Sequence, residues 1–252
     1  MSVTNLGFMH PGAMGVSLAA TAVNSGNKSY WASSGRSLET RQRAETHGLL
    51  ELSTVEELCE RCTMIVSVCP PHAATDVAEA VCNSSFAGIF VDVNAISPQR
   101  AQRLDQLMIA AGIDFVDGGI IGPPAWTANR TWLYLSGHRA AQVANCFRAG
   151  PLEVEVIGSE VGKASGLKMC FAANSKGTTA LLIAIMAAAD RLGVRQELEN
   201  QWSHHGSDFT QSTIDRIRKA TPKGWRFAGE MEEIASTFAA VGLPEGFHLA
   251  AE

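Results

Sequence analysis

The residues best suited to binding a ligand near the amino terminus are two glycines, Gly12 and Gly15. The apolar run Val3–Met9 before them predicts a buried strand, and the alanine-rich run Val16–Val23 after them predicts a helix. A strand, a tight turn and a helix in this order direct the amino end of the helix at a phosphate, because its free N–H groups and its dipole favour negative charge. We therefore expect a phosphate group to bind at this turn.

The spacing of the two glycines fits part of the dinucleotide-binding pattern G-x-G-x-x-G. Its glycines serve the tight turn, the backbone approach to the ligand and the packing of helix on strand. Gly12 and Gly15 occupy the second and third positions, and His10 stands at the first. Without a ligand, the same pattern is an ordinary strand, turn and helix. The residues expected to contact a dinucleotide here are Met9, His10, Pro11, Gly12, Ala13 and Met14.

The choice between NAD and NADP depends on the end of the next predicted strand, Lys28–Ala32. An acidic residue there binds the ribose hydroxyls of NAD, whereas an arginine accommodates the 2′-phosphate of NADP. No acidic residue lies between Lys28 and Ser37. The residues that could hold a phosphate are Ser33, Ser34 and Arg36, with Arg41 or Arg43 as weaker helpers. The pattern favours NADP, and NAD stays as the alternative because a solvated helix start carries the same residue types.

The rest of the amino-terminal part repeats the alternation of strand and helix. Strands are predicted over Thr63–Cys69, Ile89–Asn94, Ile113–Asp117, Thr131–Ser136 and Glu153–Ile157, and a glycine- and proline-rich loop over Gly118–Pro124. Apolar strands that alternate with helices are typical of an α/β fold with a doubly wound parallel sheet of the Rossmann type. Ligands of such sheets bind beyond the carboxyl ends of the strands. We expect residues 1–159 to form this nucleotide-binding domain.

No run after Ile157 is convincing as a strand, and residues 160–252 are expected to form an all-helical domain for substrate binding and dimerisation. Its first helix is long, from about Gly162 to Leu192, with Gly193 as its stop. The segment Leu181–Met186 is apolar nearly all round, so this helix should be buried on several sides. A second copy of the chain would supply the cover, and we expect a homodimer through this domain.

Composition narrows the classes of function. The 252 residues are 46% hydrophobic and 18% charged, as in an ordinary globular protein. A net charge of −5 without a basic stripe gives no reason to expect nucleic acid as a partner. No uninterrupted apolar segment reaches about 18 residues, and the amino terminus leads directly into a strand. We therefore expect no membrane span, no signal peptide and a cytoplasmic location. Cys59 and Cys62 lack a second pair at zinc-finger spacing, so no metal is expected.

Four short motifs follow one another in a characteristic order and at characteristic separations. They are Gly7–Gly15, Val91–Pro98, Asp117–Pro123 and Gly162–Lys168. Together they resemble the β-hydroxyacid dehydrogenase superfamily, which includes 3-hydroxyisobutyrate and 6-phosphogluconate dehydrogenases. The stretch Arg226–Ile234 is similar to a branch with a phosphogluconate-dehydrogenase-like carboxyl-terminal domain. The resemblance covers nearly the whole chain.

This resemblance implies an oxidoreductase that transfers hydride between a nicotinamide and a small hydroxy or oxo compound. Lys168 would be its general acid or base, because burial on an apolar helix lowers the pKa of a lysine toward neutrality. Asn94 and Ala95 would lie near the nicotinamide ribose. Cys69, Pro70 and Pro71 would pass under the adenosine side, mostly through backbone contacts.

The chain departs from the family pattern where a substrate would bind. The serine of the substrate loop is Ile121, its last glycine is Pro123, and the asparagine one turn after the lysine is Ala172. The expected substrate residues are Ile121, Gly122, Pro123, Phe171 and Ala172, with Ser175 and Lys176 as replacement polar groups. An apolar site of this kind also suits an imine reductase of the same superfamily. A third reading is an NADP-binding protein without catalysis.

Overall fold

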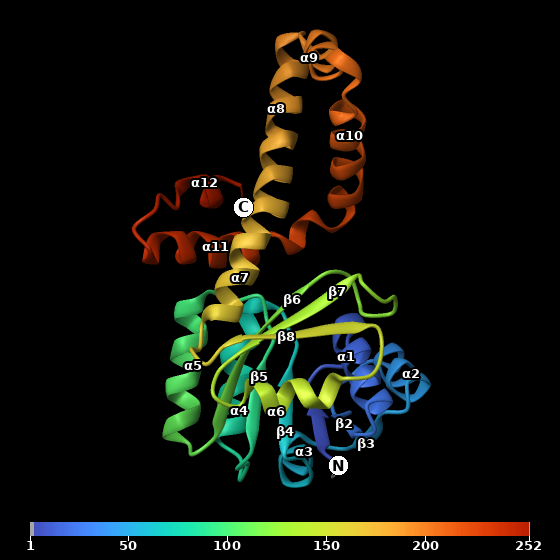
Figure 1. Ribbon diagram of the computed structural model, residues 1–252, viewed down its shortest axis with the longest axis vertical. Helices are drawn as coiled ribbons and strands as arrows, with labels where there is room; N and C mark the ends of the chain where they lie inside the picture. Colours follow the sequence, from blue (N-terminus) through green and yellow to red (C-terminus); the bar gives the residue numbers. More distant parts are fainter. Residues whose placement is uncertain (1–2, 252) are drawn as a thin grey trace. The chain divides into compact units, whose positions relative to one another are not determined.

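A computed structural model describes residues 3–251. The chain forms two compact units, one up to Met169 and one from Cys170 onward. The first unit is built on an eight-stranded sheet with the strand order β3-β2-β1-β4-β5-β6-β7-β8 (Figure 1). Its strands are β1 (Asn5–Phe8), β2 (Lys28–Ala32), β3 (Leu50–Leu52), β4 (Met64–Ser67), β5 (Ile89–Asp92), β6 (Asp114–Ile121), β7 (Thr131–Ser136) and β8 (Leu152–Gly158).

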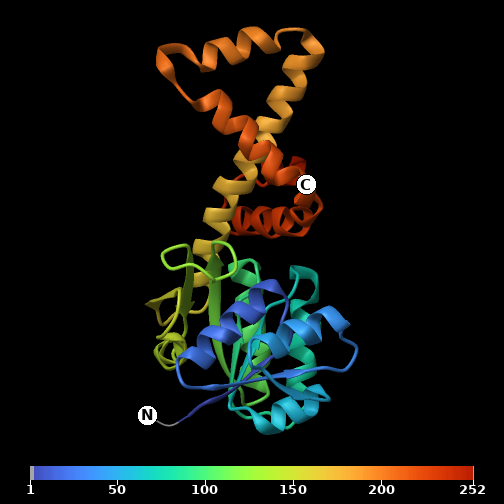
Figure 2. The same cartoon turned by 90° about the vertical axis from the view of Figure 1, so that its right-hand side faces the viewer.

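Helices cover both faces of this sheet, as Figure 2 shows. The helices of the first unit are α1 (Ala13–Asn24), α2 (Leu38–Thr46), α3 (Val55–Arg61), α4 (Ala74–Cys82), α5 (Pro98–Ala110) and α6 (Ala140–Ala144), with 3₁₀ turns at Pro71–Ala73 and Asn145–Phe147. Helices α1, α2 and α6 pack into one hydrophobic cluster, while α3, α4 and α5 pack into another. The α/β architecture with a doubly wound sheet is therefore confirmed.

The sheet differs from the sequence expectation in two places. Strand β3 was not predicted, because it has only three residues, too few for its alternation of leucine and glutamate to indicate a strand. Strand β6 continues through the glycines that were expected to form a loop, and it pairs with β7 in the antiparallel sense. The strand has a glycine at position 118 because a Cβ there would lie 2.5 Å from Val93 Cγ1.

A helix of 30 residues, Lys163–Leu192, begins in the first unit and continues into the second. It consists of α7 (Lys163–Ala172), a π-helical turn (Ala173–Gly177) and α8 (Thr178–Leu192). Gly193 ends it in the left-handed conformation at φ +69°, as the sequence predicts. The remaining helices are α9 (Arg195–Trp202), α10 (Phe209–Ala220), α11 (Ala228–Ala240) and α12 (Gly246–Ala250), with 3₁₀ turns at His204–Gly206 and Thr221–Arg226. The second unit is helical throughout its described residues.

The long helix is also the one segment among residues 3–251 that is long and apolar enough to cross a membrane by length and composition. Its most apolar window is only 33% buried. Leu181 and Ile183 of this helix are exposed, with exposed fractions of 45% and 41%. A helix that is covered by other protein has the same length and composition, so these two properties assign no membrane.

Candidate active site

The turn between β1 and α1 offers an unsatisfied helix terminus. Gly12 is the N-cap of α1, no side chain caps the helix, and no acidic residue lies in its first turn. The first amides of such a helix lack partners within the helix and attract an anion. A Cβ on Gly12 would meet nothing within 4 Å, so open space lies in front of this residue. The turn can therefore receive a phosphate at the place where the sequence predicts one.

Gly15 has a different task. A Cβ on Gly15 would lie 2.2 Å from the carbonyl oxygen of His10, so only glycine lets the turn pack on the helix. His10 stands at the position of the missing first glycine, and its buried Nδ1 has no hydrogen-bond partner among the described residues. Burial, and then the neighbouring Arg36, lower the pKa of His10 to about 4. His10 is therefore neutral at neutral pH.

Arg36 and Arg43 brace this turn from the region after β2. The Arg36 guanidinium donates to the carbonyl oxygen of Met9 at 3.2 Å, and that of Arg43 donates to Pro11 at 3.5 Å. The Nε of Arg36 is buried without a partner. Unpaired buried donors are costly unless something satisfies them. The two orphaned nitrogens beside an uncapped helix start therefore fit a cofactor that carries phosphate groups.

One acidic residue near this turn was missed from the sequence. Glu51 lies on the unpredicted strand β3, where its carboxylate pairs with Arg41. A hydrogen bond from Ser33, and then one from Arg41, lower the pKa of Glu51. Its carboxylate is thus already held by two neighbours. Ser34 also lies at this edge, where its backbone N–H donates to Ser53.

A row of polar side chains crosses the sheet at the carboxyl ends of β4 and β5. Ser67, Asp92, Asp117 and Ser136 are neighbours in register on β4, β5, β6 and β7, and each is 0% exposed. Side chains in register on adjacent strands point to the same face of a sheet. Each of these residues lies at or near the end of an apolar run in the sequence. Comparing the last residues of the predicted strands with one another would have revealed this row from the sequence.

Asn94 ties the loops after β4 and β5 together. Its Oδ1 accepts from the backbone N–H of Cys69 at 2.5 Å, and its Nδ2 donates to Ser67 at 3.0 Å and to Asp92 at 2.6 Å. The structure thus brings the predicted Cys69–Pro71 and Asn94–Ala95 segments to one edge of the sheet. Both N–H bonds of the Asn94 carboxamide are thus used inside the protein, whereas its Oδ1 accepts one hydrogen bond and keeps a second lone pair for a further contact.

Asp117 holds the start of α7. Its Oδ2 accepts from the backbone N–H groups of Gly162 at 2.9 Å and Ser165 at 3.0 Å, and from the hydroxyl of Ser136 at 3.0 Å. Its Oδ1 accepts from the Ser165 hydroxyl at 2.5 Å. Burial raises the pKa of Asp117, and these four hydrogen bonds oppose that rise. From the sequence, Asp117 was expected at the end of a strand and at the start of a substrate loop, without a role in holding a helix.

Lys168 lies on α7, one turn after Ser165. The side chain is half-buried, and its ammonium has neither an ion pair nor a hydrogen bond to any residue between 3 and 251. Burial lowers the pKa of Lys168 below its ordinary value. A lysine that is desolvated and unpaired holds its proton loosely, which suits it to acid–base chemistry.

The predicted substrate residues fall in both units. Ile121, Gly122 and Pro123 lie at the end of β6 in the first unit, and Phe171, Ala172, Ser175 and Lys176 lie in the second. Lys176, predicted as a replacement polar group, forms an ion pair with Glu230 and lies over the ring of Phe227. The Ser175 hydroxyl donates to the carbonyl of Ala172 in its own helix at 3.4 Å.

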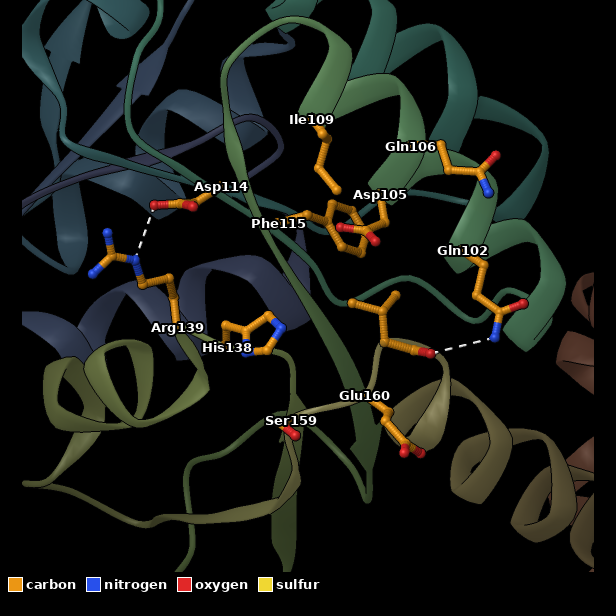
Figure 3. A pocket seen from close by; sticks show the side chains of 11 residues that line it. Gln102, Asp105, Gln106, Ile109, Asp114, Phe115, His138, Arg139, Ser159 and Glu160 are labelled. Carbon is orange, nitrogen blue, oxygen red and sulfur yellow. Dashed lines mark hydrogen bonds and ion pairs between the residues drawn. The ribbon is translucent and has the colours of Figure 1, made fainter.

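A depression of about 490 Å³ lies elsewhere on the first unit, at the amino end of β6 (Figure 3). It is lined by Gln102, Asp105, Gln106, Ile109, Asp114, Phe115, His138, Arg139, Ser159, Glu160 and Val161. Asp114 accepts from Arg139 Nε across it at 2.9 Å. Ligands of such sheets bind at the opposite edge, at the carboxyl ends of the parallel strands. The depression is therefore separate from the candidate active site.

Comparison with known proteins agrees with this geometry. Residues 5–149 match the NAD binding domain of 6-phosphogluconate dehydrogenase, and residues 189–252 match a domain of unknown function, DUF1932. A protein of Methanothermus fervidus, described as an uncharacterized 28.5 kDa protein in the 7S RNA 5′ region, is 32% identical over 164 residues. That alignment spans 65% of this chain and 62% of the relative's length.

Solved structures extend the similarity to the whole chain. A conserved protein of unknown function, reported to resemble 3-hydroxyacid dehydrogenases, is 28% identical with a TM-score of 0.74 over 98% of this chain and 95% of its own. The 3-hydroxyisobutyrate dehydrogenase of Salmonella typhimurium is 16% identical (TM-score 0.74, 98% and 92% covered). An imine reductase of Myxococcus stipitatus in complex with NAD⁺ is 18% identical (TM-score 0.63, 99% and 91% covered). The last two share the fold.

The matching domain covers more than half of the chain and includes the uncapped turn, the row of polar side chains and the strands that carry them. The chain belongs to the β-hydroxyacid dehydrogenase superfamily, and residues 5–149 are its NAD(P)-binding domain.

Proposed function

We propose that this protein is an NADP-dependent oxidoreductase that acts on a small hydroxy or oxo compound, with Lys168 as its general acid or base. One observation supports this most strongly. Lys168 is half-buried without a partner in the described chain, on a helix fixed to the strand that leads to the substrate loop. A protein gains no stability from a desolvated, unpaired lysine, and such groups concentrate at functional sites.

The dinucleotide would be held by the chain's own turns. The first amides of α1 would hold its pyrophosphate, and the segments Cys69–Pro71 and Asn94–Ala95 line the same edge of the sheet. When bound, NADP supplies the hydride acceptor, and NADPH the hydride donor. Lys168 does the proton chemistry: its neutral Nζ accepts the hydroxyl proton in oxidation, and its ammonium returns a proton to the oxygen in reduction.

The preference for NADP over NAD rests on charge. Arg36 and Arg43 both lie at the turn, and Arg36 keeps an unpartnered Nε. Glu51 would favour a ribose hydroxyl of NAD, but its carboxylate is already held by Arg41 and Ser33. The arginine side of the site is thus the more available one for a 2′-phosphate.

Two alternative functions can be distinguished from this one. An imine reductase is supported by the apolar substrate loop, in which Ile121 and Pro123 replace polar or small residues of the family pattern, and by the shared fold of the imine reductase described above. A retained Lys168 favours hydroxy or oxo substrates instead. A protein that binds NADP without catalysis would need no lysine at this position.

The test compares two lysines of one helix. Lys168→Ala removes the proposed acid or base, and Lys163→Ala removes a half-exposed lysine that pairs with Glu160 at 3.1 Å. Small hydroxy acids, ketones, aldehydes and cyclic imines are screened with wild-type protein and both nucleotides. For an accepted substrate we expect Lys168→Ala to lower kcat by about 100-fold or more, with nucleotide affinity and the Lys163→Ala variant unchanged. Turnover that is equal in all three proteins would exclude a role for Lys168.

We also propose that a second copy of the chain covers the helical unit. Its exposed apolar side chains include Leu181, Ile183, Phe247 and Leu249, each between 41% and 46% exposed. Light scattering after gel filtration without detergent measures the mass directly. A dimer that Ile183→Lys converts to a monomer supports this assembly, whereas wild-type protein that stays monomeric at the highest soluble concentration contradicts it.

A further inference from the structure

Two buried carboxylates, those of Asp92 and Asp117, lie side by side in register and accept different numbers of hydrogen bonds. Asp92 accepts from Asn94, through its backbone N–H at 3.0 Å and its Nδ2 at 2.6 Å. Asp117 accepts from four donors that belong to three residues. Burial raises the pKa of both, that of Asp92 to about 7. Since hydrogen bonds to the charged form favour ionisation, the negative charge of the pair belongs mainly to Asp117.

The donors to Asp117 converge on one structural element. Gly162 and Ser165 belong to the first turn of α7 or directly precede it, and the backbone N–H of Ala164 is bound by Ser136, which itself donates to Asp117. Amides at the start of a helix have no partners within the helix, and its dipole favours a negative charge at this end. Asp117 and Ser136 thus hold the starting turn of α7 on β6 and β7.

The same turn determines where Lys168 lies. Ser165 and Lys168 are three residues apart, so they share one face of the helix. A Cβ on Gly119 would lie 2.7 Å from the carbonyl oxygen of Ala164 and 3.0 Å from the Cβ of Lys168, so the helix rests directly on the backbone of β6. Neither Asp117 nor any other described acid contacts the Lys168 ammonium. The influence of Asp117 on Lys168 therefore passes through the helix backbone.

We propose that Asp117 is a positioning residue, which sets the place and the desolvation of the Lys168 ammonium by holding the first turn of α7 on the sheet. This rests on the proposed function only in so far as Lys168 is the acid or base. Loss of the anchor lets the first turn of α7 loosen, and water reaches Lys168. The ammonium then behaves as an ordinary exposed lysine, and the proton transfer loses its fixed geometry.

The experiment measures the pKa of Lys168 itself and does not depend on turnover. Lysines are dimethylated with ¹³C-formaldehyde, the Lys168 resonance is identified by its absence from Lys168→Arg, and its pKa is obtained by NMR titration of the full chain. Asp117→Asn places an amide opposite backbone donors, and Ser165→Ala removes one donor and leaves the carboxylate. Asp92→Asn is the matched control, because it changes an equally buried carboxylate that has no bond to α7.

We expect the Lys168 pKa to rise toward the ordinary value of 10.5 in Asp117→Asn and partway in Ser165→Ala, and to stay as in wild type in Asp92→Asn. For an accepted substrate, the kcat of Asp117→Asn should fall by about tenfold or more, while its nucleotide affinity changes less than twofold. An unchanged Lys168 pKa in folded Asp117→Asn overturns the proposal. If that variant does not fold, an unchanged value in Ser165→Ala overturns it. A shifted pKa in a protein without any activity supports the positioning role and contradicts the proposed function alone.

Discussion

Gly119 and Lys168 lie so close that a Cβ on the glycine would come within 3.0 Å of the Cβ of the lysine. The missing side chain is what allows α7 to lie on β6 and carry its lysine along the strand that ends in the substrate loop. A glycine that looks like part of a flexible loop in the sequence is thus a contact surface for the helix of the proposed acid or base.

Replacing this glycine should be costly. In Gly119→Ala the new methyl group meets the Ala164 carbonyl oxygen at 2.7 Å, and we expect the free energy of unfolding to fall by about 1–3 kcal/mol. Urea denaturation measures the change. Gly166→Ala is the control, because its Cβ would meet only Pro98 Cγ at an ordinary 3.6 Å and alanine favours a helix. Equal stability of Gly119→Ala and wild type would contradict this packing.

The two glycines of the phosphate turn should respond differently to the same change. Gly12→Ala should unfold like wild type, because its Cβ meets nothing within 4 Å, yet it should bind NADPH at least about tenfold more weakly, since the methyl group enters the ligand's space. Gly15→Ala should lose stability, because its Cβ would lie 2.2 Å from the His10 carbonyl oxygen. Thermal unfolding and nucleotide titration separate the two effects. Unchanged NADPH affinity in Gly12→Ala would show that the phosphate does not bind at this turn.

Much of the fold follows from local pattern. Lys28–Ala32 and Thr131–Ser136 are strands over the predicted residues, since short apolar runs between turn signals have few other structures. The stop at Gly193 follows from the left-handed conformation that glycine adopts most easily. Strand β3 does not follow, because it has only three residues, and the antiparallel pairing of β7 does not follow, because it depends on the path of the loop between β6 and β7.

The candidate site is predictable to a similar degree. Lys168 and the turn at Gly12 are recognisable from spacing, but the function of a polar side chain depends on its partners. Asn94, predicted near the nicotinamide ribose, binds Cys69, Ser67 and Asp92, and Lys176, predicted near the substrate, pairs with Glu230. Spacing does not predict the contacts of Asn94 with Ser67 and Cys69 or that of Lys176 with Glu230, because only the tertiary fold brings these residues together.

Asp92 should make the protein less stable as the pH rises. Its pKa is about 7 in the folded protein and near 3.8 when unfolded, so between these values the folded state binds the proton more tightly. Stability from this group is complete below about pH 4 and is lost as the pH rises through 7, by no more than about 1.4 kcal/mol per pH unit. Urea denaturation from pH 4.5 to 8 measures it. The difference between Asp92→Asn and wild type should shift in favour of the variant as the pH rises, and a constant difference would contradict this.

His10 should have the opposite effect. Its pKa is about 4 in the folded protein against 6.5 in the unfolded chain, so the unfolded state takes up the proton first as the pH falls. Stability is therefore complete above pH 6.5 and declines toward pH 4. His10→Gln keeps a polar side chain without this titration. Thermal unfolding of both proteins across this range should show a smaller decline in stability for the variant. Equal declines would show that the pKa of His10 is not lowered by folding.

The most direct test of the account is calorimetric titration of wild-type protein and Arg36→Ala with NADPH and NADH. We predict that wild type binds NADPH more tightly than NADH, and that Arg36→Ala weakens the binding of NADPH at least tenfold more than the binding of NADH, about 1.4 kcal/mol. Tighter binding of NADH would replace NADP by NAD as the cofactor. Binding of neither nucleotide to folded wild-type protein would contradict the account itself, because the turn at Gly12 would then hold no dinucleotide and Lys168 would have no hydride transfer to serve.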